Sequence, residues 1–166
     1  MLRSIALYPR FVAGDAIARV RSRFDPLATK VPPHVTLVFP FSSELSRDAL
    51  VAHMSTAIAG VGLFPVSLGD PVAIDGIVQL PVLAGEETIR LLHRRLYSGL
   101  LERFLRSDHA CSPHLTVGRC PVSEERWECL QEAASIAGTT GVADAVSCEI
   151  IERDESSTRE IDILLT

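Results

Sequence analysis

The 166-residue chain lacks the features that define several large classes of protein. It has no apolar run approaching the roughly 20 residues that a membrane-spanning helix needs. Its glycines and prolines, ten of each, are scattered, and no heptad repeat persists, which excludes collagen-like and coiled-coil structures. The first residues turn polar too soon for a secretory signal peptide. We therefore expect a cytoplasmic protein without a membrane partner.

Cysteine is also scarce. The chain has four cysteines, and none of them forms a Cys-x-x-Cys pair. Zinc sites usually draw their ligands from such pairs, so the spacing gives a metal site little support. We expect reduced and mostly buried thiols, and neither a metal nor another cofactor.

Positive charge is limited as well, since the net charge is −5 at pH 7. A broad surface for duplex nucleic acid needs a strongly basic protein, so we do not expect one here. The charge is uneven, however: residues 1–40 hold six basic and two acidic side chains, whereas residues 122–166 hold three basic and eleven acidic ones. The basic part can still hold a small phosphate ligand.

The composition, 47% hydrophobic and 22% charged, is that of a globular protein. Its length suits one domain over residues 1–166, or two small packed lobes. Hydrophobic periodicity and breaker residues predict alternating strands and helices. We expect strands at 4–8, 34–39, 64–68, 72–74, 77–83, 114–117, 146–151 and 161–165. We expect helices from Asp15 to 24, from Ser43 or Ser46 to 59, from 86 to 105 and from Ser123 to 136, with loops at 108–113 and 138–141.

One short pattern occurs twice. The chain reads Pro-His-Val-Thr-Leu at residues 33–37 and Pro-His-Leu-Thr-Val at residues 113–117. Side chains alternate across a strand, so His34 and Thr36 share one face, as do His114 and Thr116. The apolar neighbours face the other way and can pack under a helix. Two such copies, one per half of the chain, predict two related lobes that each contribute one motif.

The residue types in the motif suit phosphoryl chemistry. Histidine titrates near physiological pH, so one of the two imidazoles can act as a general base while the other acts as a general acid. The hydroxyls of Thr36 and Thr116 can donate to phosphoryl oxygens. A single His-x-Thr in a strand is usually structural, but two matched copies favour a site. The other histidines, His53, His93 and His109, lack the pattern and are expected on the surface or in the core.

The paired motifs resemble those of the 2H phosphoesterase superfamily, in particular its bacterial RNA 2′,3′-cyclic phosphodiesterase or 2′-5′ RNA ligase branch. The resemblance implies a bilobed α+β fold with a pseudo-two-fold axis, in which two antiparallel sheets line a central cleft and helices lie outside. It also implies metal-independent opening of a cyclic phosphate by His34 and His114, on an RNA terminus or a small cyclic nucleotide.

Three more positions follow from the resemblance. The family often has an aromatic residue five positions after the first histidine and an arginine five positions after the second, here Phe39 and Arg119. Phe39 can stack a base and Arg119 can hold a phosphate. Both offsets are odd, so a regular strand would direct these side chains away from the cleft unless the strand end at Pro40 and a kink at Gly118 redirect them. Tyr8, on the first strand, is a further candidate.

The expected reaction is hydrolysis of a 2′,3′-cyclic phosphate to a 2′-phosphate by a monomer. The segment after the first motif, Val-Phe-Pro-Phe at 38–41, departs from the Phe-Leu-Gly common in ligase-like enzymes, and this departure bears on ligation more than on hydrolysis. Three alternatives stay open: 2′-5′ RNA ligation, a non-catalytic RNA- or nucleotide-binding module, and a metal-dependent hydrolase. The last needs clustered ligands, yet no Asp or Glu lies within five residues of His34.

Overall fold

A computed structural model describes residues 1–106 and 111–166. The strands are β1 (Leu2–Leu7), β2 (Arg10–Phe11), β3 (Val35–Ser42), β4 (Phe64–Ser67), β5 (Val72–Ile74), β6 (Ile77–Pro81), β7 (His114–Arg119), β8 (Thr140–Ala143), β9 (Ala145–Ile151) and β10 (Ser157–Leu164). The helices are α1 (Gly14–Phe24), α2 (Arg47–Ile58), α3 (Glu86–Leu96) and α4 (Ser123–Ala133), with 3₁₀ turns η1 (Gly99–Phe104) and η2 (Ala134–Ile136). None of the helices in these ranges is long and apolar enough to cross a membrane.

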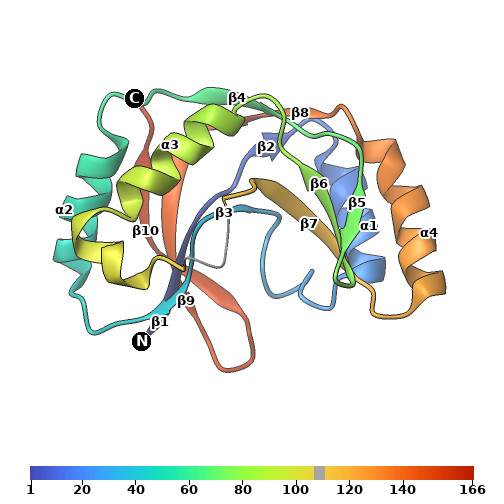
Figure 1. The fold of residues 1–166 in the computed structure, drawn as a ribbon, viewed down its shortest axis with the longest axis horizontal. Coiled ribbons are helices and arrows are strands. Elements are labelled where there is room, and N and C mark those ends of the chain that lie inside the picture. Colours follow the sequence, from blue (N-terminus) through green and yellow to red (C-terminus); the bar gives the residue numbers. More distant parts are fainter. Residues whose placement is uncertain (107–110) are drawn as a thin grey trace.

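These elements form an arch with two lobes (Figure 1). The first lobe contains the antiparallel sheet β10-β9-β1-β3, covered on its outer side by α2, α3 and η1. The sheet presents an apolar face to these helices. On β1, for example, Ile5 and Leu7 lie two positions apart, so they share one face, and both are fully buried. On α3, Ile89, Leu92 and Leu96 recur at helical spacing and are fully buried too. The helix therefore seals the sheet's apolar face and leaves the other face toward the cleft.

The second lobe is built around the antiparallel sheet β5-β6-β7, with α1 and α4 outside it. A third sheet, β2-β8-β4, lies at the top of the arch in Figure 1. An isolated bridge between Leu68 and Val82 joins the two three-stranded sheets. The α+β fold with antiparallel sheets around a central cleft is thus confirmed, with this small sheet in addition.

The two lobes interleave along the chain. The first sheet takes β1 and β3 from the N-terminal half and β9 and β10 from the C-terminal half. Helix α1 packs against β7 of the second lobe, and α3 packs against β3 of the first. A cut at the chain's midpoint would therefore split both lobes, although each lobe still holds one copy of the motif.

Several element boundaries differ from the sequence-based expectation. The long helix expected over 86–105 ends at Leu96, because Gly99, with a φ of +56°, turns the chain into η1. The expected loop over 138–141 is partly strand β8. Ser46 does cap α2 by accepting from the Ala49 amide, but the N-caps of α1 and α4 are Ala13 and Val122. Asp15 and Ser123 lie inside the first turns instead.

Candidate active site

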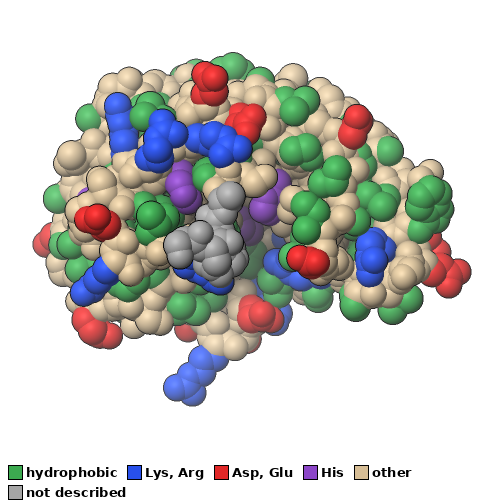
Figure 2. All heavy atoms as spheres, in the orientation of Figure 1, with side chains coloured by type: hydrophobic (Ala, Val, Ile, Leu, Met, Phe, Trp, Pro, Cys, Tyr) green, Lys and Arg blue, Asp and Glu red, His purple; other side chains and the backbone are tan. Residues whose placement is uncertain are grey.

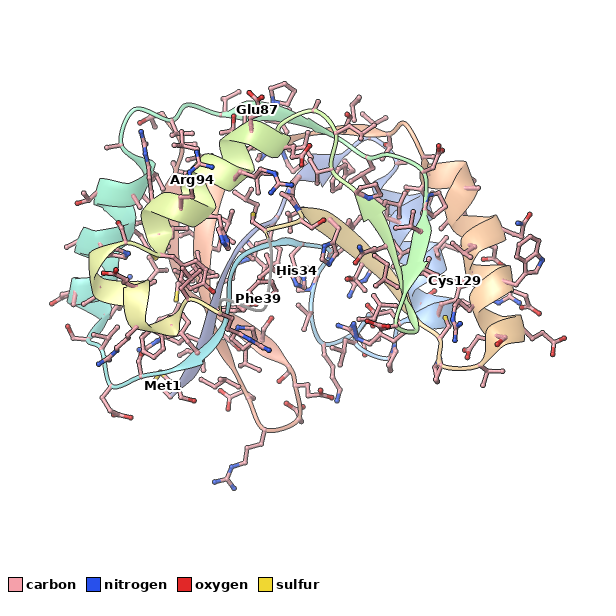
Figure 3. The ribbon with its side chains drawn as sticks, in the orientation of Figure 1. Met1, His34, Phe39, Glu87, Arg94 and Cys129 are labelled. Carbon is pink, nitrogen blue, oxygen red and sulfur yellow. The ribbon has the colours of Figure 1, made fainter. Side chains whose placement is uncertain are left out.

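The two motif histidines sit at equivalent positions on two edge strands. His34 immediately precedes β3, and His114 is the first residue of β7. β3 and β7 lie at the edges of their sheets and pack beside each other under the arch. Figure 2 shows histidine side chains gathered around the hollow of this face, and Figure 3 places His34 between the two lobes. The fold thus brings together two histidines that are far apart in the sequence.

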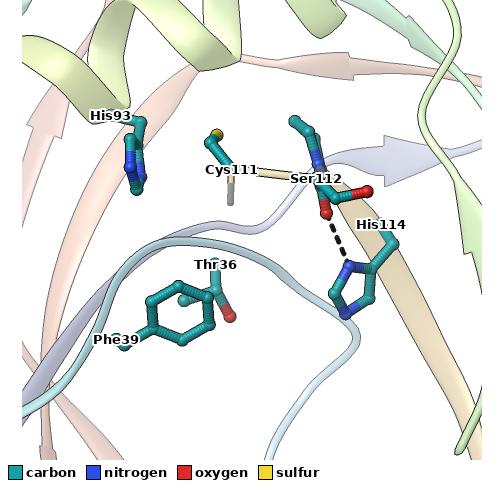
Figure 4. A pocket seen from close by; sticks show the side chains of 7 residues that line it. Thr36, Phe39, His93, Cys111, Ser112 and His114 are labelled. Carbon is teal, nitrogen blue, oxygen red and sulfur yellow. Dashed lines mark hydrogen bonds between the residues drawn. The ribbon is translucent and has the colours of Figure 1, made fainter. Parts of the chain in front are cut away.

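Both imidazoles are anchored in the same way. Nδ1 of His34 lies 2.9 Å from the carbonyl oxygen of Pro32, and Nδ1 of His114 lies 2.7 Å from that of Ser112 (Figure 4). A carbonyl oxygen only accepts, so each Nδ1 must carry the proton and donate it. Nε2 is then the nitrogen that gains or loses a proton. Neither Nε2 has a hydrogen bond to any residue that the structure describes.

A β-bulge follows the first motif. Ala6 on β1 pairs with Thr36, but the preceding residue, Ile5, pairs with Val38. One extra residue, Leu37, is therefore inserted in β3, and Leu37 and Val38 are both fully buried. The side-chain alternation shifts by one position at this point. A second irregularity in the same strand pair follows before Phe41.

The second motif has a bulge at the same offset from its histidine. Gln79 on β6 pairs with Thr116, whereas Val78 pairs with Gly118, so Val117 is the extra residue. A Cβ on Gly118 would lie 2.6 Å from the Sγ of Cys129, so the close approach of α4 requires glycine here. The kink anticipated at this glycine is therefore present, as part of a bulge.

The two bulges explain where the residues five positions after each histidine point. Phe39 lines a small pocket together with Thr36 and His114 (Figure 4). Arg119 lines a cavity of about 450 Å³ together with His34 and Thr36. Each of these two residues thus lies beside the histidine of the other motif, and Thr36 borders both spaces. Thr116 is half-buried and lines neither of them.

The side chain of Arg119 forms an ion pair with Asp25. Its Nε lies 3.4 Å from Asp25 Oδ1, and Asp25 is buried and also binds Arg21 at 2.9 Å. The Arg119 side chain is 36% exposed, so it reaches the cavity while its direction is restrained. This arrangement suits a guanidinium that binds a phosphate.

Glu149, on β9, is a cavity residue that sequence reasoning missed. Its carboxylate accepts from Ser4 Oγ at 2.6 Å and from the Tyr8 hydroxyl. Burial alone would raise the pKa of Glu149, but hydrogen bonds from Ser4, Tyr8 and Ser157 outweigh it and hold the pKa below its usual range. No motif marks this residue, because its neighbours come from distant strands.

Tyr8 lies beside His34, with the two ring centroids 5.9 Å apart. The guanidinium of Arg159 stacks on the tyrosine ring, 4.1 Å from its centroid. Burial and the bond to Glu149 raise the pKa of Tyr8, which keeps its hydroxyl a neutral donor. Tyr8 therefore belongs to the surroundings of His34, as a neighbour that binds the carboxylate.

The pKa of His34 lies below its usual value. Burial is the largest cause, and the positive charges of Arg21 and Arg119 add to it. The bond to the Pro32 carbonyl and the charge of Glu149 act in the opposite direction. His34 is therefore mainly neutral at pH 7 in the absence of substrate.

The other histidines with a described position have structural contacts. His93 is buried, and its Nδ1 lies 2.8 Å from the Leu37 carbonyl, at the first bulge. The Tyr97 hydroxyl accepts from the Phe39 amide at 3.0 Å, so α3 and the residue that follows it support the bulged backbone twice. His53 bonds the Leu96 carbonyl. His109 lies outside the described residues.

The remaining metal-ligating side chains are dispersed. In the ranges 1–106 and 111–166, no three His, Cys, Asp or Glu side chains are grouped so as to hold a metal ion. All four cysteines are free thiols. Three of them are buried and Cys111 is half-buried, which agrees with the burial expected from the sequence.

Comparisons with known proteins agree with this geometry. Residues 9–155 match the family described as the 2′-5′ RNA ligase superfamily. A Bacillus licheniformis protein named as a candidate phosphoesterase is 29% identical over 92% of this chain and 87% of its own length. The crystal structure of TT0787 from Thermus thermophilus matches with a TM-score of 0.71 at 15% identity, covering 99% of this chain and 98% of that one.

Escherichia coli LigT, in a crystal structure with 3′-AMP, matches with a TM-score of 0.60 at 17% identity, covering 99% of this chain and 97% of that one. These structural likenesses concern the fold, whereas the family match concerns the sequence. The chain belongs to the 2′-5′ RNA ligase superfamily, which confirms the resemblance to 2H phosphoesterases that its paired motifs carry.

Proposed function

We propose that this protein is a metal-independent phosphodiesterase that hydrolyses a 2′,3′-cyclic phosphate, at an RNA end or on a nucleotide, to a 2′-phosphate. One observation carries the proposal: His34 and His114 are anchored alike through Nδ1, and the two spaces that they line share Thr36, so two Nε2 atoms are available to one substrate. A pair of this kind can move one proton in and another out in a single displacement.

In this reaction one histidine takes a proton from water as the water oxygen attacks phosphorus. The bond from phosphorus to O3′ breaks, and the other histidine donates its proton to O3′. The products are a free 3′-hydroxyl and a 2′-phosphate. Thr36, Thr116 and Arg119 are proposed to bind the phosphoryl oxygens, where charge increases in the transition state. Phe39 is proposed to stack the base.

Two alternatives use the same fold. In 2′-5′ RNA ligation a ribose 5′-hydroxyl would replace the water, with the same pair of histidines. A non-catalytic nucleotide-binding module would need no acid and base, and the matched anchoring of both rings favours catalysis over it. The LigT structure with 3′-AMP supports a nucleotide ligand for this fold.

The test is product analysis with 2′,3′-cyclic nucleotides and with RNA ending in a cyclic phosphate. We expect a 2′-phosphate product from the unaltered protein. His34→Ala and His114→Ala should each lower kcat/KM by at least ~100-fold, since general acid–base catalysis contributes roughly 10²–10⁴-fold. Both rings are only half-buried, so both variants should stay folded. Either variant turning over at the original rate would contradict the two-histidine mechanism. Joined RNA ends with a 2′-5′ linkage would instead favour ligation.

A further inference from the structure

Glu149 is a buried carboxylate whose partners are uncharged. Its exposed fraction is 3%, and its two oxygens accept from the hydroxyls of Ser4 and Tyr8. No ion pair of the described residues includes Glu149. Burying a charge without an opposite charge is costly, so a neighbouring group that becomes positive on taking up a proton would be stabilised by this carboxylate.

His34 is in the right place to be that partner. Both side chains line the cavity of about 450 Å³. Tyr8 connects them directly, because its ring lies against the imidazole while its hydroxyl donates to the carboxylate. The pairing of Leu7 with Val35, continued by one residue, also sets Tyr8 opposite His34.

The remaining charges around His34 are of both signs. Glu152, Arg153 and Glu155 also border the cavity, but all three are exposed to solvent, which screens their charges. Arg21 from α1 and Arg119 from β7 both disfavour the imidazolium, although Asp25 binds both and offsets part of their charge. Arg159 from β10 stacks on Tyr8. Glu149 is thus the acid that opposes burial and two arginines at this imidazole.

Among the residues that the structure describes, none that lines the pocket of the second histidine is an acid like Glu149. The small pocket beside His114 is lined by Thr36, Phe39, His93, Cys111, Ser112 and Pro113, which include no carboxylate. Within the described residues, Glu149 from β9 is therefore a feature of the first motif's surroundings that the second motif's pocket does not repeat.

We propose that Glu149 is a positioning residue for catalysis, which acts as the counter-charge of His34 and keeps that imidazole able to take up a proton inside the cleft. Its effect on the rate rests on the proposed function, but the coupling of the two charges does not. Glu149 acts through His34 and need not touch the substrate.

The experiment is an NMR titration of the His34 ring in the free protein, with Glu149→Gln compared with Glu152→Gln. Both changes turn a carboxylate into an amide on the border of the same cavity, but Glu152 is exposed and solvent screens its charge. We expect the His34 midpoint to fall by roughly one pH unit in Glu149→Gln, the lower end of the effect of a nearby opposite charge. It should stay in place in Glu152→Gln. An unchanged midpoint in a folded Glu149→Gln protein would overturn the inference.

A reciprocal measurement covers a failure of Glu149→Gln to fold. Coupling between two sites is mutual, so His34→Ala should raise the pH at which the Glu149 carboxyl titrates, as followed by carbon NMR. An unchanged Glu149 titration would also overturn the inference.

The pH profile of kcat/KM connects the coupling to catalysis. The two limbs belong to the coupled pair of histidines, and we expect one of them to move to lower pH in Glu149→Gln. A shifted NMR titration in a protein that hydrolyses no cyclic phosphate would support the coupling while refuting the proposed function. An unshifted titration in an active enzyme would refute the coupling alone.

Discussion

Gly118→Ala is the substitution that most directly tests how the fold directs Arg119. The added methyl would lie 2.6 Å from the Sγ of Cys129, 3.2 Å from Cβ of Phe24 and 3.3 Å from the Sγ of Cys120. These neighbours come from α4, α1 and the end of β7, and all three are buried. The added methyl would meet atoms on three sides, so the Cys129 side chain must shift or the backbone of the bulge must move.

Overpacking of a well-packed interior costs typically ~1–3 kcal/mol in the free energy of unfolding. For a protein of this size, 1 kcal/mol corresponds to roughly 2–4 °C in Tm, so the expected loss is about 2–12 °C. Movement of the bulge also changes the direction of Arg119. If its guanidinium binds the phosphate, loss of a hydrogen bond worth roughly 1.5–3 kcal/mol lowers kcat/KM by ~10–150-fold.

The assay combines calorimetric Tm with initial rates on a 2′,3′-cyclic nucleotide. Gly62→Ala is the matched control, since a Cβ there meets nothing within 4 Å. Cys129→Ala removes the nearest clashing atom, so the double variant Gly118→Ala/Cys129→Ala should be more stable than the sum of the two single changes predicts, by ~0.5 kcal/mol or more. A Tm for Gly118→Ala equal to that of Gly62→Ala, or strict additivity in the double variant, would refute the packing argument.

Three further predictions concern the site and the core. Thr36→Val and Thr116→Val should each lower kcat/KM by ~10–150-fold with little change in Tm, and silent substitutions would make both threonines plain strand residues. The pH dependence of kcat/KM should be bell-shaped and unaffected by EDTA; a loss in EDTA that a divalent cation restores would favour a metal-dependent hydrolase. The Arg3–Glu160 pair, at 2.7 Å, holds the pKa of Glu160 below its usual value, so the folded state binds fewer protons than the unfolded state. The stabilisation from this pair is complete above the ordinary glutamate pKa of about 4.5, and it is lost as the pH falls through the lower pKa of Glu160 in the folded protein. In Glu160→Gln, the free energy of unfolding, measured with urea at a series of pH values, should therefore fall less steeply toward acid pH.

Local pattern was sufficient for much of the site. The Pro-His-x-Thr copies predicted a strand at each motif, because period-two alternation and the chemistry of histidine are properties of a few adjacent residues. The Asp75-Gly76 turn between β5 and β6 was also predictable, since φ values of +50° and +82° suit these residue types. The direction of Phe39 and Arg119 was not settled by the pattern, because a bulge depends on how two strands pair.

Glu149 illustrates what local pattern does not contain. Its hydroxyl partners are Ser4 on β1 and Tyr8, the residue that follows β1. They reach Glu149 because β1 pairs with β9 on one side and with β3 on the other, and this order of strands is a property of the whole sheet. A search for acids near His34 along the chain finds none, although the sheet places one on the same cavity wall. Likewise, strands β2 and β8 are too short for periodicity to reveal, and they form through pairing: β8 pairs with β4 on one side and with β2 on the other.

The two bulges have a consequence for how the site is stabilised. Each occurs three residues after its histidine, and each is supported by helical segments that pack on the strand: His93 and Tyr97 bond the β3 bulge from α3 and its C-terminal end, whereas α1 and α4 enclose Gly118. The helical segments that support the two bulges differ, although both bulges turn the residue five positions after the histidine toward the site. What the two halves share is therefore the backbone path that turns the residue five positions after each histidine toward the space beside the other motif's histidine. Such a path has two separate supports in the core, so damage to either lobe should impair the site through one motif while leaving the other motif's geometry in place.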